Sequence, residues 1–166
     1  MNIITYNPIG IIHSPFKTPD NMPIQNTGAK GVKGTIELFR DYTAGLKDLE
    51  GFSHLILIYH LHLVNHSKLL VKPFMDTEER GIFSTRSPVR PNPIGLTTVK
   101  LIKISGNILF IEDLDMLDQT PLLDIKPYIP LNKNIENLNL GWLKDKIHNF
   151  EKTKSDDRFV NNNPLD

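Results

Sequence analysis

Apolar and polar residues alternate along much of the chain with the two-residue period of β-strands. The strongest such run covers residues 54–63, where both sets of alternating positions are mostly apolar. One face would carry Leu55, Leu57, Tyr59, Leu61 and Leu63, and the other Ile56, Ile58, His60 and His62. Strands that are apolar on both faces are typical of the buried part of a sheet, so we expect this run to be a central strand.

Other stretches predict shorter strands and few helices. An isoleucine-rich run predicts a first strand over residues 3–13, and Ser105-Gly106 predicts a hairpin turn. A helical period is clear only at 141–152, while 41–49 suits a short helix or a turn. The remaining expected strands are 35–39, 82–83, 96–104, 107–114 and 122–128.

Many short strands at hairpin spacing indicate a mainly β fold, either a barrel or a sandwich, with a peripheral C-terminal helix. The length of 166 residues suits a single domain. No GxGxxG motif follows an expected strand, which argues against a Rossmann cofactor domain.

The charges balance overall but not locally. With 19 basic and 19 acidic residues, the chain is not held to nucleic acid by bulk charge. Residues 66–103 carry a net charge of +4 and residues 111–124 a net charge of −5, which suits a dipolar ligand. The absence of cysteine excludes thiolate metal sites and cysteine nucleophiles. Without a signal peptide or an apolar run long enough to span a membrane, we expect a cytoplasmic protein with no membrane partner.

The segment 81–95, GIFSTRSPVRPNPIG, contains three prolines that stiffen it into an extended loop. Arg86 and Arg90 leave this loop with no acidic residue nearby in the sequence. A guanidinium on a rigid backbone suits a carboxylate or phosphate, which it binds through two parallel hydrogen bonds. The alternative is that both arginines pair with acids from elsewhere in the fold. Asn92 adds a further donor and acceptor to the loop.

Two other clusters carry candidate chemistry. His60 and His62 would share a strand face, a spacing used by metal-binding barrels, although histidines on apolar strands are more often hydrogen-bonded core residues. The acidic group Asp113, Asp115 and Asp118, with Thr120, could bind a divalent cation or cap the backbone. A third possibility is that Asp118 and the backbone of 118–121 hold ribose hydroxyls or an ammonium group. Asp124 and Lys126 would lie on one face of the strand 122–128, where we expect them to form an ion pair.

Four ordered blocks resemble the TsaA-like, or TrmO, family over about residues 6–130. They are PIGIIHSPF (8–16), GFSHLILIYHLH (51–62), GIFSTRSPVRPNPIGL (81–96) and LDMLDQTPLLDIKPYIP (114–130). The resemblance implies a single-domain β-barrel over residues 3–130. From the helical period and the composition of the end of the chain, we expect a C-terminal extension over 131–153, which contains the helix, and a flexible tail at 154–166.

The same resemblance implies an activity. Characterised family members are S-adenosylmethionine-dependent methyltransferases that modify N6 of threonylcarbamoyladenosine beside the tRNA anticodon. They work as homodimers, with the cofactor near the subunit interface. The implied partners are therefore a tRNA and a second copy of the chain.

Matching the family motifs implies a set of cofactor contacts, with Arg86 anchoring an anionic group and the segment 118–121 cradling the cofactor. The chain departs from the family at Ile24, where an arginine is common, and at Gln119, where a glycine is common. No metal is implied and no catalytic base is assigned. Arg90 and Asn92 are expected to contact the substrate. The full cofactor set is Pro23, Ile24, Gln25, His62, Leu63, Arg86, Leu96, Asp118, Gln119, Thr120 and Pro121.

Two alternatives remain open from the residues themselves. One is a metal-dependent barrel enzyme centred on His60 and His62. The other is a nucleotide- or RNA-binding module without catalysis.

Overall fold

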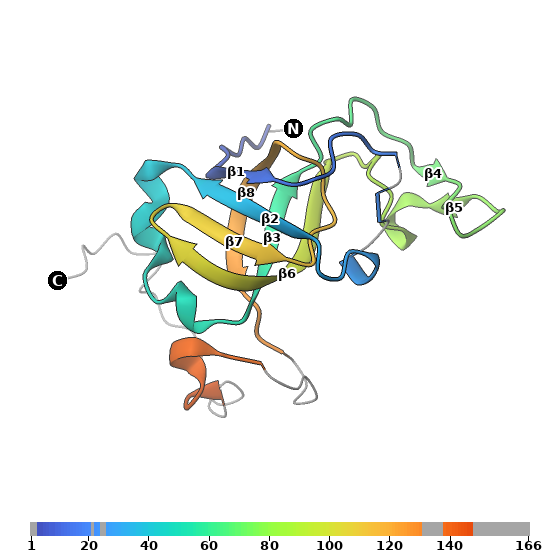
Figure 1. The fold of residues 1–166 in the computed structure, drawn as a ribbon. Helices are drawn as coiled ribbons and strands as arrows, with labels where there is room; N and C mark the ends of the chain where they lie inside the picture. The colour runs from blue at the N-terminus through green and yellow to red at the C-terminus, as the bar shows by residue number, and fades with distance from the viewer. Residues whose placement is uncertain (1–2, 21, 24–25, 131–137, 148–166) are drawn as a thin grey trace.

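A computed structural model describes residues 3–20, 22–23, 26–130 and 138–147. Six antiparallel strands close a barrel in the order β1-β2-β7-β6-β3-β8 (Figure 1). This confirms the mainly β prediction and selects a barrel over a sandwich. The barrel strands are β1 (Gly10–His13), β2 (Lys33–Leu38), β3 (His54–His60), β6 (Ile94–Ser105), β7 (Ile108–Glu112) and β8 (Thr120–Pro127).

Closure depends on the short first strand. β1 pairs with β2 on one side, Gly10 opposite Leu38, and with β8 on the other, Gly10 opposite Leu122. The N-terminal strand therefore joins two edges that would otherwise expose unpaired backbone groups.

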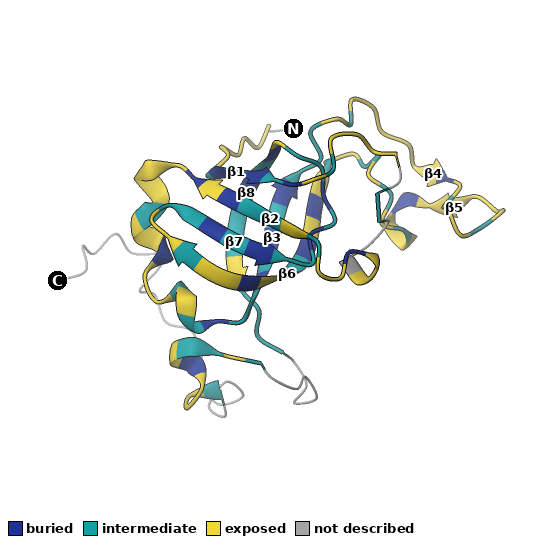
Figure 2. Cartoon of the chain, viewed as in Figure 1, coloured by how far each residue is buried: buried dark blue, intermediate teal, exposed yellow. Residues whose placement is uncertain are grey.

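The core fills the barrel through alternate positions on each strand. On β3, Leu55, Leu57 and Tyr59 are buried, whereas the intervening Ile56 and Ile58 are only half-buried. Figure 2 shows the same banding of dark blue and teal along the barrel strands. The expectation of a strand buried on most of its length is therefore half correct, because a barrel has only one interior. The largest fully buried side chains are Ile12, Ile36, Leu55, Leu57, Ile82, Leu109, Ile111, Leu114, Leu122 and Val99.

Several strand boundaries differ from the predictions. Only the end of 3–13 is a strand: Ile3 and Ile4 are exposed, and among residues 3–9 Ile9 forms backbone hydrogen bonds, to Leu122 and Phe39, just before β1 begins. β3 ends at His60, so His62 lies beyond it. The predicted strand at 82–83 lies instead in a 3-10 helix, η4 (Ile82–Ser84). The hairpin is confirmed, with Gly106 at a positive φ of 61° between β6 and β7.

The remaining elements lie outside the barrel. β4 (Leu70–Val71) and β5 (Arg80–Gly81) form a separate two-stranded sheet, seen at the right of Figure 1. The region expected to be a short helix or turn contains two 3-10 helices. The 3-10 helices other than η4 are η1 (Asn26–Gly28), η2 (Arg40–Leu46), η3 (Leu49–Gly51) and η5 (Gly141–Leu143).

The expected C-terminal helix at 141–152 is not confirmed. Its described part is the three-residue helix η5 and a following turn, and residues 148–152 lie outside the described residues. Residues 131–137 and the expected tail at 154–166 also lie outside the described residues. In the described ranges, no helix has the length and apolar character needed to cross a membrane.

Candidate functional site

The bend at residues 118–121 precedes and opens β8, and its first residue binds the end of β1. One carboxylate oxygen of Asp118 accepts a hydrogen bond from the Ser14 backbone N–H at 2.9 Å. The other accepts from the Lys17 ammonium at 2.5 Å and from the Gln119 amide at 3.4 Å. Burial alone would raise the pKa of Asp118, but these bonds outweigh it and lower the pKa to about 2. The bend therefore carries a negative charge at neutral pH.

The next two residues are fixed by side-chain contacts. Gln119 has a φ of 62°, in the left-handed region, and its amide nitrogen lies 3.1 Å from His13 Nδ1. Thr120 is buried; its hydroxyl donates to the Leu117 carbonyl at 2.7 Å and lies 3.5 Å from His62 Nδ1. The bend thus brings together three segments that are far apart in the sequence.

His62 follows the end of β3 and contacts the bend through Thr120. Burial lowers its pKa, and the neighbouring His60 lowers it further, so His62 is neutral at pH 7 and can accept a hydrogen bond or a proton. The backbone N–H of Leu61 donates to the Pro93 carbonyl at 2.8 Å, which ties this segment to the proline-rich loop. Leu63, next in the chain after His62, and Leu96, on β6 opposite Ile58, are both more than half exposed.

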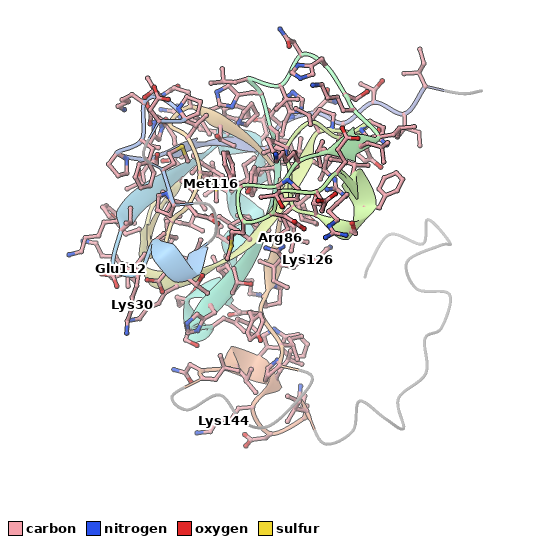
Figure 3. The ribbon with its side chains drawn as sticks, turned by 90° about the vertical axis from the view of Figure 1, so that its right-hand side faces the viewer. Lys30, Arg86, Glu112, Met116, Lys126 and Lys144 are labelled. Carbon is pink, nitrogen blue, oxygen red and sulfur yellow. The ribbon has the colours of Figure 1, made fainter. Side chains whose placement is uncertain are left out.

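The two arginines of the proline-rich loop have different environments. Arg90 donates to the Thr85 carbonyl at 2.9 Å and to the Ile82 carbonyl at 3.3 Å, so it braces the loop from within. Arg86 is exposed, and its charge acts on Tyr59 (Figure 3 views this side of the molecule and labels Arg86). Asn92 is exposed at the end of the loop. The sequence could not tell the roles of the two arginines apart, because both lie in the same proline-rich segment, within two residues of Pro88.

Tyr59, near the end of β3, is a buried phenol whose pKa responds to Arg86 and Asp115. It pairs with Leu122, one residue beyond the bend, and with Gly95. Burial raises the pKa of Tyr59, the negative charge of Asp115 raises it further, and the positive charge of Arg86 opposes both. The phenol stays protonated at neutral pH, and Arg86 and Asp115 lie close enough to act on it.

An open depression of about 430 Å³ lies on the other side of the bend, on the outer face of β1, β2 and β7. The predicted residues Asp118 and Gln119 line it, whereas Arg86, His62, Leu63 and Leu96 do not. The predicted set therefore does not fill one cavity, and His62 is the member outside the bend that contacts it, through Thr120. The depression is lined by His13, Ser14, Pro15, Lys17, Lys33, Gly34, Thr35, Phe110, Asp118 and Gln119.

The other candidate residues have local explanations. Asp113 accepts a hydrogen bond from the Gly31 backbone N–H at 2.7 Å, so it caps the backbone. Asp124 and Lys126 form the expected ion pair at 2.8 Å. Within the described ranges, no group of three or more metal-binding side chains could hold a metal ion, so His60 and His62 find no third ligand there.

Sequence reasoning missed His13, Lys17 and Tyr59. Two of them could have been found from the family motifs, because His13 lies inside the first block (8–16) and Tyr59 inside the second (51–62). Pro23 lies in the described loop with its side chain against Gly28. Ile24 and Gln25 lie outside the described residues, so their predicted cofactor contacts stay predictions.

The model of the tRNA-methyltransferase O N-terminal domain matches residues 11–133, about three quarters of the chain. The chain belongs to the TrmO family. A probable S-adenosyl-L-methionine-binding protein of Pyrococcus abyssi is 53% identical over 161 residues, which cover 97% of this chain and 88% of that protein. The predicted family is confirmed.

More distant TrmO relatives are longer than this chain. A crystal structure of TrmO from Pseudomonas aeruginosa superposes with a TM-score of 0.67 at 33% identity, covering 82% of this chain and 60% of that one. The mouse tRNA (adenine(37)-N6)-methyltransferase is 37% identical over 146 residues, 84% of this chain and 34% of that protein. The chain thus spans about three fifths of the solved TrmO chain and a third of the mouse protein.

Proposed function

We propose that this protein is an S-adenosyl-L-methionine-dependent methyltransferase that methylates N6 of threonylcarbamoyladenosine beside the tRNA anticodon. The observation that carries the proposal is the bend 118–121, with its ionised Asp118 and its contact to His62, in a chain of the TrmO family. The relatives named above as S-adenosyl-L-methionine-binding and tRNA-methylating proteins support both the cofactor and the substrate class.

The side chains around the bend suit this cofactor. Its methionine part carries an ammonium and a carboxylate, for which the ionised Asp118 and the exposed Arg86 are complementary. Leu63 and Leu96 offer exposed apolar surface for an adenine ring. When bound, the sulfonium supplies an activated methyl group, so the residues of the chain mainly need to align donor and acceptor.

The substrate contacts are proposed on the proline-rich loop. Asn92 offers an exposed amide to the tRNA, and Arg90 acts indirectly, because its hydrogen bonds to Thr85 and Ile82 maintain the shape of the loop. The catalytic base stays unassigned.

The proposal includes a homodimer. Many of the exposed large apolar side chains fall within residues 63–96, a concentration that favours contact with another protein surface. The proposed cofactor residues Arg86 and Leu96 belong to the same region, so a second copy docking there would cover the cofactor site. Light scattering during gel filtration distinguishes a dimer from a monomer. The exposed apolar residues of this region are Leu63, Leu69, Leu70, Phe74, Met75, Phe83, Ile94 and Leu96.

Calorimetric titration with S-adenosyl-L-methionine tests the anchoring role of Arg86. We expect Arg86→Ala to weaken binding by roughly 10- to 100-fold, because a charge-assisted contact to the cofactor carboxylate is lost. Arg80→Ala is the matched control, since Arg80 is bonded to Asp76 at 2.7 Å and lies in β5. Equal affinities of Arg86→Ala and the wild type would reject the anchoring role.

Methyl transfer separates the enzyme from a non-catalytic binding module. Labelled cofactor should transfer its methyl group to tRNA taken from cells that lack this protein. Mass spectrometry of the nucleosides should then show the mass of methylated threonylcarbamoyladenosine. Cofactor binding without transfer to this tRNA would support the binding module instead.

A further inference from the structure

His13, at the end of β1, touches the bend from the side of the open depression. Its Nδ1 lies 3.1 Å from the amide nitrogen of Gln119, and its Nε2 lies 3.6 Å from a carboxylate oxygen of Glu37 on β2. The ring is about one third exposed. One imidazole thus lies between an acid on the barrel wall and a residue of the bend.

The hydrogen-bond pattern favours one tautomer of the neutral His13 ring. The Gln119 amide nitrogen also lies 3.4 Å from an Asp118 oxygen, so the donor end of that amide faces a carboxylate. A neutral imidazole has one donor and one acceptor nitrogen. If the Gln119 amide nitrogen donates to Nδ1, a neutral ring carries its proton on Nε2, on the side of Glu37.

The conformation of Gln119 gives this contact its importance. A φ of 62° is uncommon for a residue with a side chain, and it persists only where the surroundings stabilise it. The amide of Gln119 is held by His13 on one side and by Asp118 on the other. These two contacts stabilise a backbone shape that glycine would adopt without help.

We propose that His13, oriented by Glu37, is a positioning residue that holds Gln119 and thereby keeps the bend 118–121 in its binding conformation. This inference rests on the proposed role of the bend in cofactor binding. The charged groups facing His13 are Glu37 from β2 and Asp118 from the bend, the latter 3.8 Å from Nδ1 and itself bonded to Lys17.

A double-mutant cycle tests the proposal. His13→Ala should weaken S-adenosyl-L-methionine binding roughly 3- to 10-fold, the effect of one lost hydrogen bond. His13→Asn should restore most of it, because its side-chain oxygen can accept near the position of Nδ1. In the Gln119→Gly background, whatever the affinity of that variant, adding His13→Ala should change nothing. An equal loss in both backgrounds would overturn the proposal. His66→Ala, in an exposed loop, is the matched control.

Two measurements without cofactor separate this inference from the proposed function. Nitrogen-15 NMR of the imidazole at about pH 8, where histidines are ordinarily neutral, should show the proton on Nε2. His13→Ala should lower the thermal midpoint of unfolding in the wild-type background but not in Gln119→Gly. If the wild type binds no S-adenosyl-L-methionine, the proposed function fails. The coupling between His13 and Gln119 is still tested, because the NMR and unfolding measurements need no cofactor. A proton on Nδ1, or no coupling in unfolding, would overturn the role of His13.

Discussion

The Asp118 carboxylate accepts several of the hydrogen bonds that hold the bend. It receives hydrogen bonds from Ser14, Lys17 and Gln119, which join the loop after β1 to the start of β8. Because these partners stabilise the carboxylate over the neutral acid, the folded protein holds the ionised form more strongly than the unfolded chain does.

This environment predicts how Asp118→Asn changes stability with pH. The folded pKa of about 2 lies below the ordinary value of 3.8, so the stabilisation is complete above about pH 4 and is lost as the pH falls towards 2. At pH 7 we expect the free energy of unfolding of the variant to be about 1–2 kcal/mol lower than that of the wild type, a cost typical of lost hydrogen bonds to a charged group. Thermal unfolding at several pH values measures the difference. A gap that stays constant down to pH 2, or one matched by the exposed control Asp20→Asn, would contradict it.

The residue types of the site could be predicted from the sequence better than their roles. Arg86 and Arg90 look equivalent in the sequence, yet Arg90 bonds carbonyls of its own loop while Arg86 is exposed. That difference depends on how the chain folds back at η4, which no local pattern encodes. His13 escaped notice because its partner Gln119 is 106 residues away.

Among the elements, the strands inside the barrel were the most predictable. β3 and the β6–β7 hairpin have clear alternation and a turn sequence, and the structure has them near the expected positions. Alternation failed for residues 3–8, where the pattern exists but the structure has no strand; pairing with β8 begins only at Ile9. It also missed β4 and β5, because two-residue strands are too short to show a period.

Gly95 on β6 leaves room for the ring of Tyr59 on the neighbouring strand β3. A Cβ at this position would lie 2.2 Å from the ring of Tyr59 on β3. Gly95→Ala should therefore displace the ring and destabilise the protein by about 1–3 kcal/mol. It should also weaken cofactor binding, since Tyr59 lies near Arg86. Denaturant unfolding and calorimetry measure the two effects.

Gly81→Ala is the matched control for Gly95→Ala. A Cβ at Gly81 meets no atom within 4 Å, and its φ of −61° suits alanine. The two variants should therefore differ clearly in both measurements. Similar stabilities would mean that the Tyr59 ring moves aside without cost.

At the scale of the whole molecule, a closed barrel is accompanied by a small sheet of two two-residue strands. The barrel strands share a continuous core, whereas β4 and β5 pair only Leu70 with Gly81 and Val71 with Arg80. The order of the barrel strands was not evident from composition or period. It depends on the pairing of β1 with β8, from the two ends of the barrel sequence; the family resemblance implied a barrel but not this order.

Amide hydrogen exchange should divide the molecule along the same line. Buried barrel amides open only in large unfolding events, whereas a two-residue pairing opens locally. We expect the paired amides of β4 and β5 to exchange at least about 100-fold faster than those in the middle of β3. Uniform protection across both sheets would contradict this division.

The pairing of β1 with β8 also has a consequence for synthesis on the ribosome. Gly10 pairs with Leu122, so the earliest barrel strand to emerge must wait for the latest one. Until then, the nascent barrel has two open edges and the hydrophobic side chain of Ile12 has no complete interior to enter. Folding should therefore be completed late, after β8 has left the exit tunnel.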